Sequence, residues 1–211
     1  MYIPNAYRVE EKAELLAFMR QNSFATLVSI VDGSPFASHL PLAVVDNGEQ
    51  ILLRGHFAKA NPHWLAHENG GELLTIFNGA HAYIAPAQYE AHEAVPTWNY
   101  VAVHAYGELR LLAAGETTLA TLEELFDSFD ASYREQWQTL SDKYKNGMLQ
   151  GIVAFEITVT RLEGKAKLSQ NRSLTDQTNV ANWLLTHEDA SAKEVGRLML
   201  EKVNAQPGLG D

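Results

Sequence analysis

The sequence predicts an α+β fold in which a small antiparallel β-barrel carries peripheral helices. At least six strand-like segments follow one another through short turns, an order typical of small barrels. Helical patterns gather at the N-terminus, in one insertion and at the C-terminus, and do not alternate with the strands. The 211 residues are 46% hydrophobic and 20% charged, which is enough apolar material for a packed core.

The first third of the chain predicts one helix followed by an antiparallel meander. Val9 to Asn22 has the spacing of an amphipathic helix. Alternating apolar residues predict strands at 24–31, 36–45 and 51–57, and turn-forming residues such as Asp46-Asn47-Gly48 separate them. Asn61-Pro62 is a helix-start signal, since a capping residue precedes a proline in the first turn.

The remainder predicts four more strands and four more helices. Strands are expected at 73–77, 81–85, 100–112 and 152–162, with Asn78-Gly79 as the turn between the first two. Helices are expected at 117–133, 141–148, 180–187 and 192–203, and Ser191 and Glu194 have capping-box spacing at the last one. We therefore expect residues 1–172 to form the barrel, with a helical insertion near 115–150. Residues 173–211 are expected to form a C-terminal helical extension packed on it.

The composition argues against several classes of protein. The absence of cysteine removes disulfides, thiolate metal ligands and thiol nucleophiles. Neither a secretory signal nor an apolar run of about 20 residues is present, so a cytoplasmic protein without membrane contact is expected. The formal net charge of −10 disfavours direct DNA binding, because a DNA-contacting face would have to work against the overall field.

Aromatic residues and histidines concentrate in the middle of the chain. Seven of the eight histidines lie between His39 and His104. The segment from Ala60 to Leu109 contains no lysine or arginine, but it holds seven aromatic residues: Trp64, Phe77, Tyr83, Tyr89, Trp98, Tyr100 and Tyr106. This composition suits a planar, polar aromatic ligand better than a phosphate polymer.

Basic residues return between Arg161 and Arg172, where only Glu163 opposes them. The run from Lys167 to Arg172 holds two cations, a hydroxyl and two amides, a set that can neutralise and hydrogen-bond a phosphate. A solvated loop after a strand explains the same residues. The six residues alone leave both readings open.

Several segments, in order along residues 1–172, resemble signatures of the PaiB family of FMN-binding negative transcriptional regulators. Each is short, and their order makes the resemblance specific. They are Met1-Tyr2-Ile3-Pro4, Phe24 to Ser29, Ala37 to Leu42, Gly55 to Trp64, Phe77 to Ile84, Val95 to His104 and Lys167 to Arg172. Ala87-Gln88-Tyr89 departs from the pattern, which usually has serine and tryptophan before the tyrosine.

The resemblance implies an FMN-binding split β-barrel, similar to pyridoxamine-phosphate oxidases, with FMN at a homodimer interface. The strand Ser38-His39-Leu40-Pro41 would lie along the flavin ring, which His56 and Phe57 would flank. Lys59 and Asn61 would grip the phosphate. Further contacts would come from Thr97, Trp98 and Asn99 of the partner and from Lys167, Ser169, Gln170 and Arg172.

Simpler structural roles compete with some of these assignments. Asn61 could be only a helix cap, Trp98 only interface packing, and His39 a strand histidine with a hydrogen-bond partner. His63 and His67 lie four apart, but the spacing fixes no third metal ligand, so no metal site is expected. Rossmann, nucleophile-elbow and P-loop motifs are absent from the sequence.

Three functional hypotheses remain. The resemblance implies an FMN-binding regulator, but no helix-turn-helix is recognisable, so regulation would act through another protein or a metabolite. A flavin-dependent oxidoreductase is the second, because bound FMN supplies redox chemistry by itself. A haem-binding or haem-degrading barrel is the third, although no histidine is placed as an obvious axial ligand.

Overall fold

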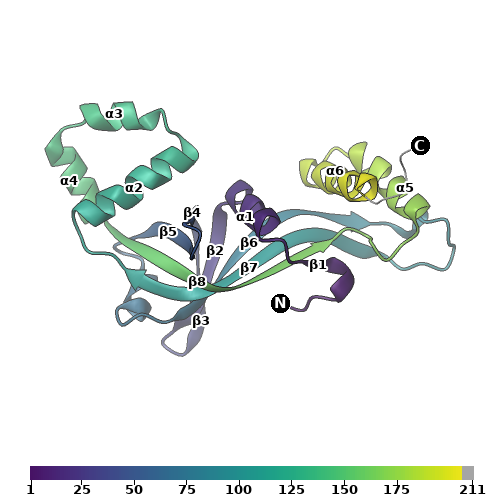
Figure 1. Ribbon diagram of the computed structural model, residues 1–211, viewed down its shortest axis with the longest axis horizontal. Coiled ribbons are helices and arrows are strands. Elements are labelled where there is room, and N and C mark those ends of the chain that lie inside the picture. The colour runs from purple at the N-terminus through teal and green to yellow at the C-terminus, as the bar shows by residue number, and fades with distance from the viewer. Residues whose placement is uncertain (206–211) are drawn as a thin grey trace. The chain divides into compact units, whose positions relative to one another are not determined.

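The computed structural model describes residues 1–205, whose strands form one eight-stranded sheet (Figure 1). The strands are β1 (Arg8–Val9), β2 (Phe24–Val31), β3 (Ser34–Pro41), β4 (Ala43–Asp46), β5 (Ile51–Ala58), β6 (Glu72–Ile84), β7 (Thr97–Leu111) and β8 (Ile152–Lys167). Hydrogen-bonded neighbours follow the order β3-β2-β6-β7-β8-β5-β4, and β1 pairs with β8. The α+β class with an antiparallel sheet is confirmed.

Six α-helices and three short 3₁₀ helices connect or flank these strands in the described part of the chain. The α-helices are α1 (Lys12–Gln21), α2 (Glu116–Phe129), α3 (Tyr133–Thr139), α4 (Asp142–Gln150), α5 (Leu174–Leu185) and α6 (Ala190–Asn204). The 3₁₀ helices are η1 (Asn5–Tyr7), η2 (Pro62–His67) and η3 (Pro86–Gln88). None of the helices in residues 1–205 is both long and apolar enough to cross a lipid bilayer.

The contacts divide the chain into two compact units, each made of separate segments. Unit 1 comprises residues 1–14, 78–103 and the described residues from Glu163 onward. Unit 2 comprises residues 15–77 and 104–162. The strands β6, β7 and β8 each contribute residues to both units.

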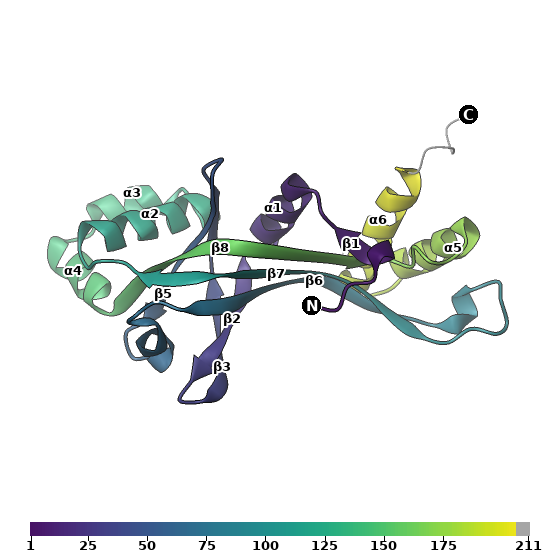
Figure 2. The same ribbon diagram turned by 60° about the horizontal axis from the view of Figure 1, so that its bottom comes forward.

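Unit 2 has an aromatic and aliphatic core between its strands. Phe57 of β5 and Phe155 of β8 are fully buried, with ring centroids 4.6 Å apart. Leu27 of β2 and Phe77 of β6 are also fully buried. The helices α2, α3 and α4 form a cluster beside β4 and β5 (Figure 2), where Leu122 and Leu125 of α2 are buried together with Ala43. The expected helical insertion is therefore present.

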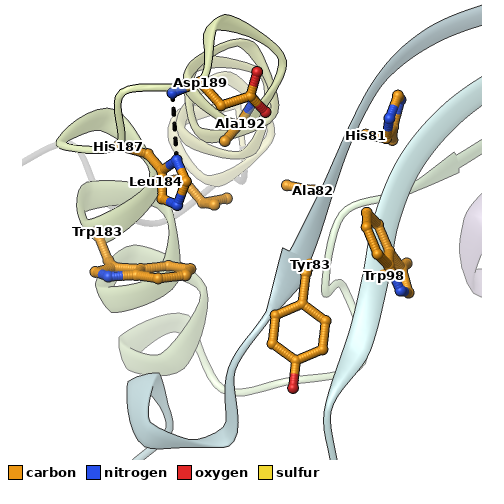
Figure 3. A pocket seen from close by; sticks show the side chains of 9 residues that line it. All are labelled: His81, Ala82, Tyr83, Trp98, Trp183, Leu184, His187, Asp189 and Ala192. Carbon is orange, nitrogen blue, oxygen red and sulfur yellow. Dashed lines mark hydrogen bonds between the residues drawn. The ribbon is translucent and has the colours of Figure 1, made fainter.

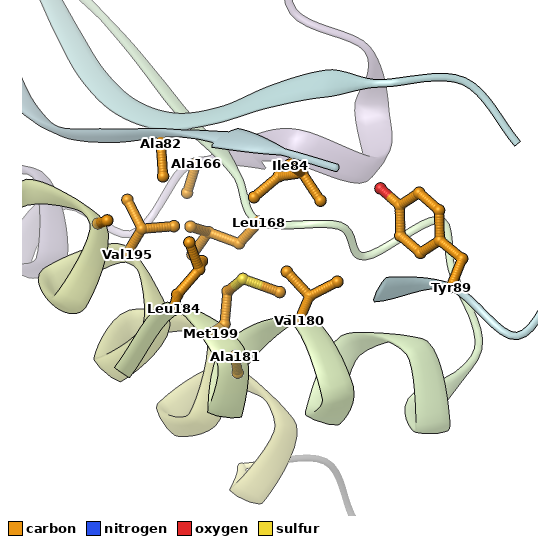
Figure 4. Packing of buried hydrophobic residues seen from close by; sticks show 11 residues of the cluster. Ala82, Ile84, Tyr89, Ala166, Leu168, Val180, Ala181, Leu184, Val195 and Met199 are labelled. Atoms are coloured by element: carbon orange, nitrogen blue, oxygen red, sulfur yellow. The ribbon is translucent and has the colours of Figure 1, made fainter. Parts of the chain in front are cut away.

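Unit 1 has its own core, in which α5 and α6 cover one face of β6 and β8. Ala82 and Ile84 of β6 and Ala166 of β8 face the two helices (Figure 4). The helices supply the buried side chains Val180, Ala181, Leu184, Val195 and Met199. Because about 25 cal/mol is gained per Å² of apolar surface buried, this contact holds the C-terminal helices in place.

Some local predictions were wrong at the ends of elements. Asn78-Gly79 is not a turn, because β6 is continuous across it for 13 residues. The last helix is capped by Asp189, whose carboxylate accepts hydrogen bonds from the backbone N–H groups of Ser191 and Ala192. The helix expected at 117–133 ends at Phe129, and α3 begins at Tyr133.

Candidate functional site

In unit 2, Ser38 belongs to a buried hydrogen-bonded network that joins β3 to the segment after β5. The amide of Asn61 donates from Nδ2 to Oγ of Ser38 at 2.9 Å. The same hydroxyl lies 2.9 Å from Nδ1 of His63, whose Nε2 lies 2.6 Å from Oγ of Ser29. One imidazole therefore connects two buried serine hydroxyls, and Ser38 is held from two directions.

The ring of His63 is uncharged at neutral pH. Its side chain is fully buried, and this burial, with a contribution from nearby His67, lowers its pKa to about 4. A neutral imidazole has one N–H and one lone pair, so one serine hydroxyl donates to the ring and the other accepts from it. Burial also lowers the pKa of His67, whose two ring nitrogens are buried without a hydrogen-bond partner among the described residues.

The remaining residues of the Ser38–Pro41 strand segment lie nearer the surface. His39 is exposed, and its Nδ1 lies 2.9 Å from the hydroxyl of Thr26 on β2. Its ring stacks on Phe24 at a centroid distance of 6.4 Å and an interplanar angle of 23°. Leu40 and Pro41 are half-buried. The strand therefore presents a partly apolar surface beside one exposed imidazole.

His56 and Phe57 are neighbours on β5 and point to opposite faces of the sheet. Phe57 belongs to the core and lies with its ring centroid 5.3 Å from that of His63. His56 is half-buried, and burial lowers its pKa. Its Nδ1 is buried without a hydrogen-bond partner in residues 1–205, so the ring retains an unused polar atom.

Lys59 and Asn61 follow β5 directly. The backbone of Lys59 is fixed, since its N–H donates to the carbonyl of Gly151 at 2.8 Å and its carbonyl accepts from the indole of Trp64 at 3.0 Å. Its ammonium group has no ion pair or hydrogen bond within residues 1–205. Asn61 caps η2 by accepting from the N–H of His63 at 3.0 Å. Because η2 has only six residues, its dipole is small, and Lys59 is the stronger candidate for binding an anion.

In unit 1, Lys167 at the end of β8 ties down the start of β7. Its ammonium group donates to the hydroxyl of Thr97 and, at 2.7 Å, to the carbonyl of Trp98. Burial and the nearby charge of Lys165 lower the pKa of Lys167. The indole of Trp98 is 54% exposed, which makes it one of the largest apolar surfaces on this unit.

Asn99 and Ser169 meet inside unit 1. The amide of Asn99 donates from Nδ2 to Oγ of Ser169 at 2.9 Å, and both side chains are buried. Ser169 has a φ of 65°, in the left-handed region that non-glycine residues rarely occupy. Oδ1 of Asn99 has no hydrogen-bond partner among the described residues. Because buried acceptors are usually paired, Oδ1 of Asn99 can accept a hydrogen bond from a donor other than the described residues.

Gln170 and Arg172 complete the turn after β8. The side chain of Gln170 accepts from the N–H of Leu168 at 2.7 Å and donates to the carbonyl of Ala166 at 2.6 Å. The guanidinium of Arg172 lies over the ring of Tyr89, 4.3 Å from its centroid. Gln170 is thus occupied in shaping the turn, and Arg172 keeps its hydrogen-bond donors available.

The fifteen predicted site residues therefore fall into two sets. Unit 2 holds Ser38, His39, Leu40, Pro41, His56, Phe57, Lys59 and Asn61, and unit 1 holds Thr97, Trp98, Asn99, Lys167, Ser169, Gln170 and Arg172. Ser29 and His63 were not assigned to the site from the sequence. A signal for Ser29 existed, because it continues the inward positions of Ala25 and Leu27 on β2. A polar residue at such a position needs a buried partner.

The two histidines of η2, His63 and His67, are both buried. The ring centroids of His63 and His67 are 5.9 Å apart. Within residues 1–205, no three His, Cys, Asp or Glu side chains come together in a way that could hold a metal ion.

Comparison with known sequences identifies relatives that align over most of this chain. A family model described as "Putative FMN-binding domain" matches residues 1–161. The "Protease synthase and sporulation protein PAI 2" of Bacillus subtilis is 38% identical over 209 residues, which cover 98% of this chain and 100% of that protein. The "Uncharacterized protein AN0679" of Emericella nidulans is 30% identical over 226 residues, covering 85% and 88%.

Comparison with solved structures identifies the same architecture. An FAD and haem binding protein from Mycobacterium smegmatis superposes with a TM-score of 0.62 at 15% identity, covering 76% of this chain and 73% of that one. The flavocytochrome Anf3 of Azotobacter vinelandii gives a TM-score of 0.60 at 13% identity, covering 76% and 69%. At these identities the similarity shows the fold alone.

Proposed function

The chain belongs to the PaiB family of FMN-binding proteins, and on that premise we propose that it is a regulatory protein which holds FMN at a homodimer interface. The observation that carries the proposal is the family match over residues 1–161, supported by 38% identity to PAI 2 across nearly the whole chain. The name of that relative refers to protease synthesis and sporulation. We propose a regulatory role for this chain as well, but we do not propose that it regulates protease synthesis or sporulation.

The side chains of unit 2 fit the polar and anionic parts of FMN. Lys59 offers an ammonium group with no partner among the described residues, which suits a phosphate. His56 offers a buried, unpaired nitrogen on a ring whose pKa is lowered, which suits an uncharged ring edge better than a phosphate. Ser38 is positioned by hydrogen bonds with Asn61 and His63, which fixes the orientation of its hydroxyl in the proposed site.

From unit 1, Thr97, Trp98 and Asn99 of the partner subunit would reach the flavin, and the residues from Lys167 to Arg172 would complete the contacts to its phosphate or ring edge. Asn99 retains an unused acceptor, and Arg172 retains guanidinium donors. Trp98 is exposed and would stack or pack at the interface. FMN supplies a redox-active ring when bound. The residues of the chain bind and orient it and exclude water around it.

Absorption of the purified protein in the visible range tests the cofactor assignment. We expect flavin bands, and changing Lys59 to Ala should lower the FMN content at equal protein concentration because a phosphate loses its counter-charge. Lys143, an exposed lysine on α4, gives the matched control. Full occupancy in Lys59→Ala would contradict the phosphate assignment, and a Soret band would favour the haem alternative.

Light scattering tests the dimer. Phe24 of unit 2 is 69% exposed, Ile30 of unit 2 is 61% exposed and Trp98 of unit 1 is 54% exposed, and a dimer would cover such apolar side chains. We expect a mass twice that of the 23.4 kDa chain. A monomer that nevertheless retains FMN would overturn the shared site while leaving FMN binding intact.

Fluorescence anisotropy with duplex DNA at low salt tests the mode of regulation. The net charge of −10 supports regulation through another protein or a metabolite. Tight, salt-sensitive DNA binding would contradict this. An oxidoreductase is the alternative, and rapid reduction of the bound flavin by NADH or NADPH in stopped flow would favour it.

A further inference from the structure

Unit 1 contains a pocket lined largely by aromatic residues. Its volume is about 260 Å³, and it lies between α5 and the start of α6 on one side and β6 and β7 on the other (Figure 3). The residues that line it are His81, Ala82, Tyr83, Trp98, Trp183, Leu184, His187, Asp189 and Ala192. We name it the α5–β7 pocket.

Aromatic rings stand on both sides of the α5–β7 pocket. On the strand side, the ring of Trp98 lies 5.9 Å from that of Tyr83 at 71° and 6.1 Å from that of His81 at 39°. On the helix side, Trp183 lies 5.7 Å from His187 at 79°. Figure 3 shows these two groups across the opening from each other. Faces of tryptophan and tyrosine rings attract cations through their quadrupoles.

The lining of the pocket holds one carboxylate and two imidazoles. Asp189 is the one acidic residue among the nine lining residues, and none of the nine is lysine or arginine. Its carboxylate accepts hydrogen bonds from the N–H groups of Ser191 and Ala192, both at 3.2 Å. A full negative charge exceeds the roughly half positive charge of a helix N-terminus, so the pocket mouth remains negative. A carboxylate or phosphate ligand would find neither lysine nor arginine among the lining residues.

Hydrogen bonds tie the two walls of the pocket together. The hydroxyl of Ser191 donates to the carbonyl of His81 at 2.9 Å and accepts from the N–H of His81 at 2.8 Å, which fastens the start of α6 to β6. Leu184 and Ala192 are buried and contribute apolar side chains to the lining. Walls that are already in place reduce the ordering cost of binding.

From this geometry we propose that the α5–β7 pocket binds a small organic cation, a methylated or alkylated ammonium group held between aromatic rings and Asp189. The volume lies below the roughly 300–1,000 Å³ of pockets for drug-sized ligands, which sets the size class of the ligand. The proposal does not depend on FMN. Trp98 is the one lining residue that also belongs to the proposed FMN set, so the test leaves Trp98 unchanged.

Calorimetric titration with choline and its uncharged carbon isostere 3,3-dimethylbutan-1-ol tests the charge preference. The two compounds share a shape and differ in the charge of the head group. We expect choline to bind saturably and at least about tenfold more tightly than the isostere, the scale of one cation–π contact. Equal affinity, or no saturable choline binding, would overturn the proposal.

Two variants test the residues. Asp189→Asn removes the charge but keeps a good N-cap, so α6 should remain stable while choline binding weakens several-fold. Trp183→Leu removes one aromatic wall and should weaken choline binding about tenfold. Asp142→Asn, an exposed carboxylate in the first turn of α4, is the matched control and should bind choline like the parent protein. Unchanged choline affinity in both pocket variants would also overturn the proposal.

FMN content, measured by visible absorption on the same samples, separates this proposal from the proposed function. We expect it to be the same in Trp183→Leu and in the parent protein. If this variant loses both FMN and choline binding, the pocket is part of the flavin site. That result would overturn a separate cation site.

Discussion

Nε2 of His63 lies 2.6 Å from Oγ of Ser29, although the two residues are 34 positions apart in the chain. This hydrogen bond is buried, and the other ring nitrogen of His63 continues to Ser38. The position of Ser38 therefore depends on a strand, β2, that contributes no residue to the predicted cofactor set.

Replacing Ser29 with Ala should lower the free energy of unfolding by about 1–3 kcal/mol, because Nε2 of the buried ring loses its partner. Urea denaturation followed by circular dichroism gives the value. Ser34, which is exposed on β3, provides the matched control, and Ser34→Ala should be nearly neutral. Equal stability of Ser29→Ala and the parent protein would contradict the network.

The stability of the protein should fall as the pH drops below about 6.5. The folded pKa of His63, about 4, lies below the ordinary value of 6.5, so between these values the unfolded chain binds a proton that the folded chain does not. The free energy of unfolding then declines by at most about 1.4 kcal/mol per pH unit for this residue. Above pH 6.5 both states are neutral, and His63 adds no pH dependence.

Urea midpoints measured between pH 4 and pH 8 check this expectation. In His63→Gln, which cannot titrate, the decline below pH 6.5 should be shallower than in the parent protein. His56 and His67, whose pKa values are also lowered by burial, leave a residual slope. An identical slope in His63→Gln would contradict the assignment of a neutral buried ring.

Adding a methyl group at Gly107 should destabilise the sheet of unit 2. A Cβ there would lie 2.5 Å from the carbonyl oxygen of Thr158 and 2.7 Å from Cγ2 of Ile157, and backbone cannot move aside as a side chain can. We expect Gly107→Ala to lose at least about 1–3 kcal/mol. Gly147→Ala in α4, where a Cβ has open space within 4 Å, should gain about 0.5–1 kcal/mol. Thermal unfolding of both variants gives the change in stability, and an unfolding temperature of Gly107→Ala equal to that of the parent protein would contradict the close contact.

A larger side chain at Gly196, where α6 contacts α5, should also destabilise the protein. A Cβ on Gly196 would lie 2.8 Å from the carbonyl oxygen of Ala181 and 3.1 Å from Cβ of Leu184. Gly196→Ala should therefore push the helices apart and lower the free energy of unfolding by about 1–3 kcal/mol. Lys193→Ala, on the exposed side of the same helix, serves as the control. A stabilising effect of Gly196→Ala would show that the two helices do not pack this closely.

The strands were predictable wherever one face is buried, because their side chains alternate. The expected strand 24–31 coincides with β2, in which Ala25 and Leu27 point inward. The prediction of a turn at Asn78-Gly79 was wrong, because these residues favour a turn only locally and strand pairing overrides that preference. Gly48 shows the contrast: in the turn between β4 and β5 it has a φ of 90°, whereas Gly79 is not among the glycines of positive φ.

The sequence allowed the residues of the candidate site to be proposed, but not the contacts that each of them makes in the fold. Lys59 and Lys167 stand out in the sequence because basic residues are scarce around the aromatic segment. Their surroundings depend on tertiary contacts: the ammonium group of Lys167 donates to the hydroxyl of Thr97, 70 residues away, whereas the ammonium group of Lys59 has no hydrogen bond or ion pair within residues 1–205. Spacing along a chain carries no information about such partners.

The segmented composition of unit 1 has a consequence for synthesis on the ribosome. Its core joins Ala82 of β6 to Met199 of α6, and Val9 packs against the same cluster. The apolar face of β6 is therefore synthesised early but stays uncovered until the residues of α5 and α6 have left the ribosome. Nascent chains stalled before α5 should accordingly recruit chaperones, and release of the completed chain should end that association.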